Sequence, residues 1–419
     1  MKKSFVLTLV FITTLFLSAC SSQQAVTVQE DVPKPEVASN VENAKSSAAE
    51  KPTDVKSGEN VVRSVFSLAL DEGVWLARIV PSQEKDVFFA VGFNDKTVSS
   101  PYQVYKISNN SVEKLVDLPF NTDTINNPYG NIDSIRFSNL IGSMLFIGMK
   151  SNMMNTDAHV ATIDINTHQI YKSATLKDQK DAQLVLDNVG NSYVFSLDTS
   201  QEVFMQQITK DGEIKEKKDL GKKSAGTMGM IYGAIYHNGF FLLALNGPSG
   251  YTQSTLMQFD VNGSFQKSVV TDEAVFKLLS ASRENVMALE MGGLESMEAQ
   301  AVVYTSDLAK VKTFKTPSFY EEIAYQGSTL ALSNDLLFLG KKAFGDTNKD
   351  MDIMRYSTGT EPSLLVRIKN DERPSAMVIN LTNAFASSNK FYVGATEMTQ
   401  TGEKVNSFFN LYEINLVNQ

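Results

Sequence analysis

Cysteine and histidine are nearly absent from this chain, and their scarcity narrows the chemistry it can perform. Of 419 residues, one is cysteine and three are histidine. A single thiol, Cys20, excludes a disulfide framework. No two of His159, His168 and His237 stand at metal-ligand spacing, which disfavours a zinc site and a catalytic triad. We expect His168 and His237 to lie in exposed turns.

Positive charge is also in deficit, with a formal net charge of −9 at pH 7. An acidic chain is poorly suited to binding nucleic acid or to lying flat on anionic lipid. With 42% hydrophobic and 20% charged residues, the chain has the composition of a protein with a large folded core. No glycine loop of the phosphate-binding kind precedes a helical pattern.

The N-terminus carries an export signal. Lys2 and Lys3 precede a short apolar run, Phe5 to Leu17, which is too short to span a membrane convincingly. The following Ser18-Ala19-Cys20 completes a motif that resembles the bacterial lipobox. The resemblance implies cleavage after residue 19 and diacylglyceryl modification of Cys20. An ordinary secretory signal is the alternative.

The lipobox resemblance also implies a location. Several acyl chains on one cysteine anchor firmly, because each buried CH₂ contributes ~0.8 kcal/mol. Ser21 after the cysteine implies the outer membrane in a Gram-negative cell, whereas a Gram-positive cell would hold the protein on the outer face of its membrane. Residues 20–60 lack aromatic residues and any sustained apolar period, so they predict a disordered tether.

A hairpin pattern recurs along the rest of the chain, residues 61–419. Met205 to Leu220 contains the turn pair Asp211-Gly212, and a second copy surrounds Asn262-Gly263. Looser copies are Val104–Leu118, Thr162–Leu176, Val303–Lys315 and Met354–Ile368. With two further strand-like runs before each hairpin, the unit is about 50 residues of four antiparallel strands, which is typical of a propeller blade.

The ends of the repeat array predict how it closes. The last unit lacks a fourth strand, and Val61–Leu70 is a lone strand-like run that can supply it. We therefore predict an all-β fold, a β-propeller of seven four-stranded blades closed by an N-terminal strand. Six or eight blades and a two-sheet sandwich are the alternatives.

The best-marked propeller families are not matched. Trp75 is the one tryptophan, so neither the WD dipeptide nor the tryptophan-docking pattern of quinoprotein propellers is present. In its lipobox, length and architecture the chain is similar to the barrel-assembly lipoprotein of the outer membrane, which has a propeller body. It lacks the repeated Ala-Leu-Asp and Gly-Lys-Trp signatures of that family. No functional residue is carried over from it.

One loop has the spacing of a cation site. Asp346, Asn348, Asp350 and Asp352 place oxygen ligands at alternate positions, which suits calcium. The spacing resembles the first half of an EF-hand-type loop, but Met351 stands at the sixth position instead of glycine, and Ser357 at the twelfth instead of glutamate. We expect a structural calcium ion or, alternatively, a polar turn. No cofactor is required.

Acidic and glycine residues of the strand-like runs are candidates for function. Glu290 and Glu322 could line a central channel and act as acid and base. Glu321 and Glu322 are adjacent in a strand and face opposite sides, and we expect all three to be solvated edge charges. Gly92, Gly148 and Gly394 indicate bulges or close packing between blades, and the methionine clusters indicate core filling and a pliable contact surface.

These observations predict a membrane-anchored lipoprotein of the cell envelope, held by the lipid on Cys20. Its propeller would act as a non-enzymatic platform for an envelope protein partner or a ligand. The alternatives are a propeller hydrolase or lyase acting on glycans or small esters, and a calcium-stabilised structural domain.

Overall fold

The computed structural model describes residues 54–57, 60–94, 102–108, 111–120, 135–150, 157–179, 181–225, 229–248, 250–280, 282, 284–291, 299–316, 330–332, 335–341, 351–356, 363–368, 376–387, 390–401 and 404–415. All of them belong to one compact unit, Glu36–Gln419. They form strands and turns and contain no helix, so none of these segments is an apolar helix that could cross a membrane.

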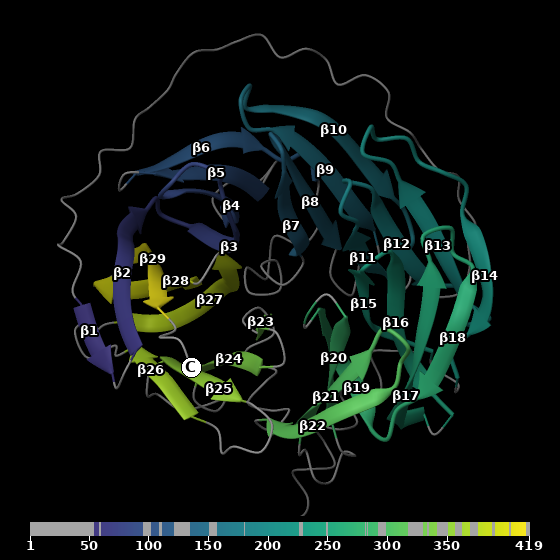
Figure 1. Cartoon of the computed structure of the whole chain (residues 1–419). Coiled ribbons are helices and arrows are strands. Elements are labelled where there is room, and N and C mark those ends of the chain that lie inside the picture. Colours follow the sequence, from purple (N-terminus) through teal and green to yellow (C-terminus); the bar gives the residue numbers. More distant parts are fainter. Residues whose placement is uncertain are drawn as a thin grey trace, which may run out of the picture. The chain divides into compact units, whose positions relative to one another are not determined.

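The described strands form six antiparallel sheets of four strands and one of five. In each four-stranded sheet the strands follow in chain order (Figure 1). Three of these sheets are β3 (Val74–Pro81), β4 (Val87–Asn94), β5 (Tyr102–Ser108) and β6 (Ser111–Asp117); β7 (Ile135–Ile141), β8 (Met144–Lys150), β9 (Ala158–Asp164) and β10 (Gln169–Leu176); and β11 (Gln183–Leu186), β12 (Ser192–Leu197), β13 (Glu202–Ile208) and β14 (Lys218–Lys223).

The other three follow the same plan. They are β15 (Ile231–His237), β16 (Phe240–Gly247), β17 (Gly250–Asp260) and β18 (Phe265–Val270); β19 (Ala274–Ser280), β20 (Asn285–Met291), β21 (Ala299–Thr305) and β22 (Lys310–Thr316); and β23 (Leu330–Leu332), β24 (Asp335–Lys341), β25 (Met351–Tyr356) and β26 (Ser363–Ile368). We call β6, β10, β14, β18, β22, β26 and β2 the outer strands. Repeated four-stranded sheets make the fold propeller-like.

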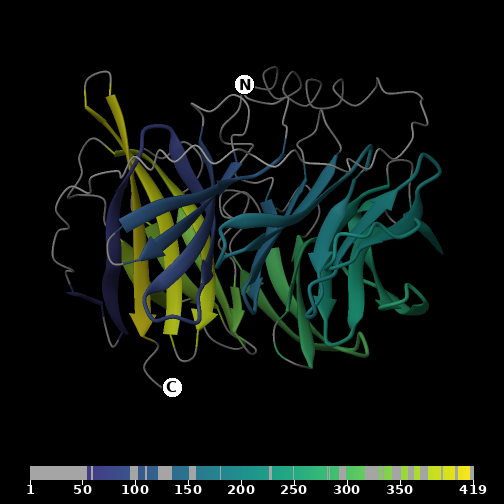
Figure 2. The ribbon, with the colours of Figure 1, turned by 90° about the horizontal axis from the view of Figure 1, so that it is seen from above.

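The five-stranded sheet joins the two ends of the described chain. Its order is β1 (Asp54–Ser57), β2 (Asn60–Leu70), β29 (Lys404–Asn415), β28 (Lys390–Thr401) and β27 (Ala376–Ser387). β2 pairs with β29 from Val61 opposite Asn415 to Leu70 opposite Ser407. In Figure 2 the purple β2 runs beside the long yellow strands of this sheet.

β1 lies in the segment that the sequence assigns to the tether. It pairs with β2 through four residues, Asp54 opposite Arg63 to Ser57 opposite Asn60. Strand pairing uses backbone groups, so an open sheet edge can order a neighbouring segment that has no strong strand pattern of its own.

The core lies at the seams between neighbouring sheets. Second strands such as β12 and β16 are buried along almost their whole length, because a sheet in this arrangement packs on both faces. One apolar cluster joins β3–β6 to β7–β10, another joins β11–β14 to β15–β18, and a third brings Phe66 of β2 against Phe88 of β4. The first strand of each sheet contacts the first strand of the next sheet along the chain, in the order β3, β7, β11, β15, β19, β23 and β27. β27 in turn contacts β3.

The predicted turns follow one local design. Asp260 Oδ1 accepts the backbone N–H groups of Asn262 and Ser264, and Thr305 Oγ1 accepts those of Asp307 and Ala309. Three residues after each acceptor the chain enters the left-handed region, at Gly263 and Leu308. Short polar side chains stabilise turns in this way.

Bulges interrupt several first strands. The register shifts between Leu76 and Arg78 in β3, and between Ile135 and Phe137 in β7. Arg78 Nε and Nη2 each donate to the Ile135 carbonyl at 3.3 Å, across the seam between the two sheets. Gln183 Nε2 donates to the Ile231 carbonyl in the same way, at 2.8 Å. In both cases the accepting carbonyl, of Ile135 or Ile231, lies beside a bulge.

Glycines lie opposite these bulges, as predicted, and allow the strands to approach closely. A Cβ on Gly92 would lie 2.6 Å from the Trp75 carbonyl oxygen, and one on Gly148 would lie 2.2 Å from the Phe137 ring. Gly394 also faces a bulge, since it pairs with Asn383 beside a register shift. The close packing at Gly92 and Gly148 is between strands of one sheet, and the alternative prediction of packing between blades is wrong for these two glycines.

Candidate functional site

Most residues of the predicted sites lie outside the described residues. This holds for Cys20, Asp346, Asn348, Asp350, Glu321 and Glu322. Asp352 lies in strand β25, paired with Gly340 and Arg367, because the strand begins two residues earlier than the sequence predicts. Within the described ranges no three acidic, histidine or cysteine residues gather to hold a metal ion.

Glu290 is completely buried in β20, so the prediction that it is a solvated edge charge is wrong. β20 is a second strand with sheets on both faces, a tertiary effect that local sequence does not report. Tyr304 donates its hydroxyl to Glu290 Oε1 at 2.7 Å, and Gln300 Nε2 lies 3.4 Å from Oε2. Burial raises the pKa of Glu290 to about 7, against the opposing effect of the Tyr304 hydrogen bond.

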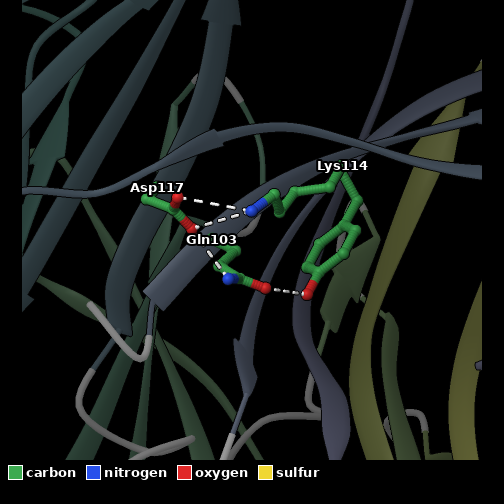
Figure 3. A network of polar contacts seen from close by, with 4 residues as sticks. Gln103, Lys114 and Asp117 are labelled. Atoms are coloured by element: carbon green, nitrogen blue, oxygen red, sulfur yellow. Dashed lines mark hydrogen bonds and ion pairs between the residues drawn. The ribbon is translucent and has the colours of Figure 1, made fainter. Parts of the chain in front are cut away.

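A second polar network runs outward through the β3–β6 sheet (Figure 3). Tyr105 donates to Gln103 Oε1, and Gln103 Nε2 donates to Asp117 Oδ1 at 2.7 Å. Lys114 Nζ then lies 3.3 Å from both carboxylate oxygens of Asp117. Burial raises the pKa of Tyr105, while the Lys114–Asp117 end is about half exposed. The network connects the core to the outer strand.

Two more sheets place a tyrosine hydroxyl on an acidic side chain. Tyr193 lies 3.3 Å from Asp187 Oδ2, and burial raises its pKa to about 12. Tyr392 donates to Glu413 Oε2 at 3.0 Å. These bonds satisfy buried polar groups within a sheet. Sequence reasoning missed them because these contacts depend on how the strands pair and no local spacing indicates them.

The three histidines occupy different surroundings. His168 lies in an exposed turn with a φ of 57°, as predicted. His237 is only 4% exposed, which corrects the prediction of an exposed turn: its Nδ1 lies 2.9 Å from Ser280 Oγ on β19 of the next sheet. His159 is buried with Nδ1 2.9 Å from Thr175 Oγ1, and burial lowers its pKa to about 4.

We expect His159 to make the protein sensitive to acid. Its folded-state pKa is below its unfolded value, so the unfolded chain binds the proton more tightly and stability falls as pH drops from 6.5 towards 4. Between pH 7 and pH 5 the loss is about 2 kcal/mol. Urea unfolding should show a shallower pH dependence for His159→Gln, with the exposed His168→Gln as control. Equal slopes in all three proteins would contradict this assignment.

Lysines of the outer strands reach the turn of the following sheet. Lys218 Nζ of β14 donates to the Asn262 carbonyl, and Lys267 of β18 pairs with Asp307. The cleft between β10 and the Gly212 turn has room for about one water molecule. Outer strands and turns therefore pack tightly here, and this cleft is too small for an organic ligand.

Comparisons with known proteins assign no family. No protein-family model matches the chain, and no curated protein matches it. Among solved structures, an uncharacterized protein, lmo1340, from Listeria monocytogenes EGD-e is 8% identical, covering 85% of this chain and 96% of its own, with a TM-score of 0.42.

Two further structures are similarly distant. The β-propeller domain of the Trilobed protease from Pyrococcus furiosus is 9% identical, covering 80% of this chain and 98% of its own, with a TM-score of 0.44. The N-terminal domain of Nup159 is 10% identical, covering 86% of this chain and 98% of its own, also with a TM-score of 0.44. Similarities at this level assign no function.

Proposed function

We propose that this protein is a lipid-anchored envelope protein whose seven-bladed propeller, closed by β2 against β29, is a non-enzymatic binding platform. The β2–β29 pairing and the chain-order contacts of the first strands support the closed architecture. The lipobox resemblance at Cys20 supports the anchor. Export would place the platform in the outer membrane of a Gram-negative cell or on the outer face of a Gram-positive membrane.

The observation that carries the platform proposal is where the buried polar groups direct their bonds. Glu290 bonds to Tyr304, His159 to Thr175 and Tyr193 to Asp187, each within one sheet. These groups stabilise their own sheets and leave recognition to the exposed loops and edges.

The anchor is tested by metabolic labelling with an alkyne fatty acid. We expect label on the wild-type protein in the membrane fraction, and an unlabelled, soluble Cys20→Ala variant. Ser21→Ala is the matched control and should keep both label and fractionation. A Cys20→Ala variant that stays on the membrane would contradict the lipid anchor.

The platform is tested by chemical crosslinking in native envelopes. Full-length protein is compared with a lipidated tether that ends at Asn60. We expect a stoichiometric protein partner only with the full-length chain. A correctly acylated and folded chain that recovers no partner would count against the platform and direct attention to glycan ligands.

The calcium loop remains a proposal for Asp346, Asn348 and Asp350. If calcium is bound there as a structural ion, chelation should lower the melting temperature by several degrees, because a ligand that binds only the folded state stabilises it. Asp350→Asn should abolish the response, whereas the exposed Asp211→Asn should keep it. An unchanged melting temperature on chelation would make the loop a polar turn.

A further inference from the structure

Two turns of the β15–β18 sheet contain the same dipeptide, asparagine followed by glycine. Asn238-Gly239 connects β15 to β16, and Asn262-Gly263 lies in the turn from β17 to β18. Both asparagines are exposed. Glycine has no side chain to hinder attack by its own backbone nitrogen, so an asparagine that precedes it is prone to lose its side-chain amide. The sequence alone does not distinguish the two sites.

The turn at Gly263 is held closed by hydrogen bonds and by packing. The Gly263 N–H donates to the Asp260 carbonyl at 2.9 Å, and Asp260 Oδ1 accepts the N–H groups of Asn262 and Ser264. Gly263 is buried, and a Cβ on it would lie 2.8 Å from the Leu220 side chain of the preceding sheet. A reaction at the Gly263 nitrogen must therefore open this turn first.

The turn at Gly239 is held less firmly. Gly239 is exposed, and a Cβ on it would meet no atom within 4 Å. Among the backbone hydrogen bonds of the described turns, none is donated by Gly239. Its N–H faces the Tyr236 hydroxyl: burial raises the pKa of Tyr236, and the Gly239 amide opposes that shift. The Tyr236 hydroxyl lies at the surface, so water reaches the Gly239 nitrogen while the hairpin stays folded.

We propose that Asn238 is a site of spontaneous deamidation in the folded protein and that the Gly263 turn protects Asn262. The Gly239 nitrogen attacks the side-chain carbonyl carbon of Asn238. A new carbon–nitrogen bond forms, the side-chain carbon–nitrogen bond breaks, and the amide leaves as ammonia with the proton of the Gly239 N–H. Water then opens the succinimide ring at either carbonyl and leaves aspartate or isoaspartate at residue 238. The reaction requires neither the anchor nor the platform.

Modification at Asn238 acts on the seam with the following sheet. The preceding residue, His237, pairs with Phe240 across the turn, and its Nδ1 lies 2.9 Å from Ser280 Oγ on β19. Isoaspartate adds a methylene group to the main chain, and a two-residue hairpin turn has no room for it without shifting His237 relative to Phe240. The isoaspartate form therefore has a weaker contact between β15 and β19.

The test compares the two asparagines within one full-length protein, incubated at mildly alkaline pH. Chymotryptic peptides separate the sites, because Phe240 and Phe259 lie between them, and mass spectrometry measures conversion of each amide to the acid. We expect Asn238 to convert at least about tenfold faster than Asn262, since the Gly263 turn must first break three hydrogen bonds to Asp260. Equal rates, including no conversion at either site, would overturn the proposal.

Two controls separate the effect of the fold from that of local sequence. In urea above the unfolding transition, Asn238 and Asn262 should convert at similar rates. Asp260→Ala removes the carboxylate that holds the Gly263 turn, so Asn262 should react at least about fivefold faster, the effect of one lost hydrogen bond, with Asn238 unchanged. An Asn262 that stays slow under both conditions is protected by its neighbours in sequence, and the structural assignment is then wrong.

The effect on the seam is measured on the isolated isoaspartate form, which anion exchange separates from the unreacted chain by its extra negative charge. We expect its melting temperature to fall by at least about 2 °C. Asn238→Asp is the matched control, because it adds the charge without the methylene group. Aspartate tolerates the φ of 46° at this position, so this variant should melt like the wild type. Equal melting of the isoaspartate form and the unreacted chain would overturn the effect on the seam.

Discussion

Replacing Glu290 with glutamine should stabilise the protein at pH 8 by about 3 kcal/mol, the equivalent of moving a carboxyl pKa from 4.5 to about 7. The wild-type carboxyl is completely buried and must ionise in the folded state above pH 7. Glutamine keeps an oxygen that can accept the Tyr304 hydroxyl. The free energy of unfolding in urea, measured from pH 4 to pH 9, gives the comparison.

The direction of this pH dependence follows from the linkage between folding and proton binding. The folded state binds the Glu290 proton more tightly than the unfolded state, so stability decreases as pH rises from 4.5 through 7 and is flat above. Nearby Asp272 and Glu273 raise this pKa and Lys310 lowers it. Glu290→Gln should lose this slope, while Glu213→Gln, at an exposed carboxylate, should retain it. A variant slope equal to the wild-type slope would show that Glu290 binds its proton equally well in the folded and unfolded states.

Replacing Gly148 with alanine should destabilise the protein by about 3 kcal/mol, the upper range for overpacking a core. The new methyl group would lie 2.2 Å from the Phe137 ring, so the ring or the β7 bulge must move. Melting temperature and urea unfolding both measure the loss.

Two further variants isolate this contact. Phe137→Leu in the Gly148→Ala background removes the ring and should recover part of the loss. Gly233→Ala is the matched control, because its new methyl group meets nothing nearer than 3.5 Å. Alanine also loses less conformational entropy than glycine when a strand forms, so this change should not destabilise the protein. If Gly233→Ala and Gly148→Ala cost the same, steric contact with Phe137 is not the cause.

The hairpins could be predicted from sequence because turn chemistry is local. Asn238 and Gly239 both have positive φ, as a two-residue hairpin of this kind requires, and they connect β15 to β16 where expected. Gly148 was predicted to mark a bulge or close packing between blades, and it lies opposite the bulge in β7. The Asn238-Gly239 turn depends on backbone conformations that few residue types adopt, and Gly148 depends on the absence of a Cβ.

The environment of single side chains could not be predicted in the same way. Glu290 and His237 resemble solvated residues in sequence, yet both are buried by strands distant in the chain. β1 was assigned to the tether because Asp54–Ser57 has no strand pattern, and its order comes from the edge of β2. Asp352 belongs to a ladder with Gly340 and Arg367, a pairing that local spacing does not encode.

The pairing of β2 with β29 has a consequence for the order of synthesis. β2 is among the first strands to leave the ribosome, and its ladder partner is the last. Until residue 415 emerges, the apolar segment Ser64–Leu70 has neither β29 nor a completed seam to cover it. Translation that stops early, or a nonsense mutation in the final repeat, therefore leaves an uncharged strand exposed at the opposite end of the polypeptide, and such products should be prone to aggregate.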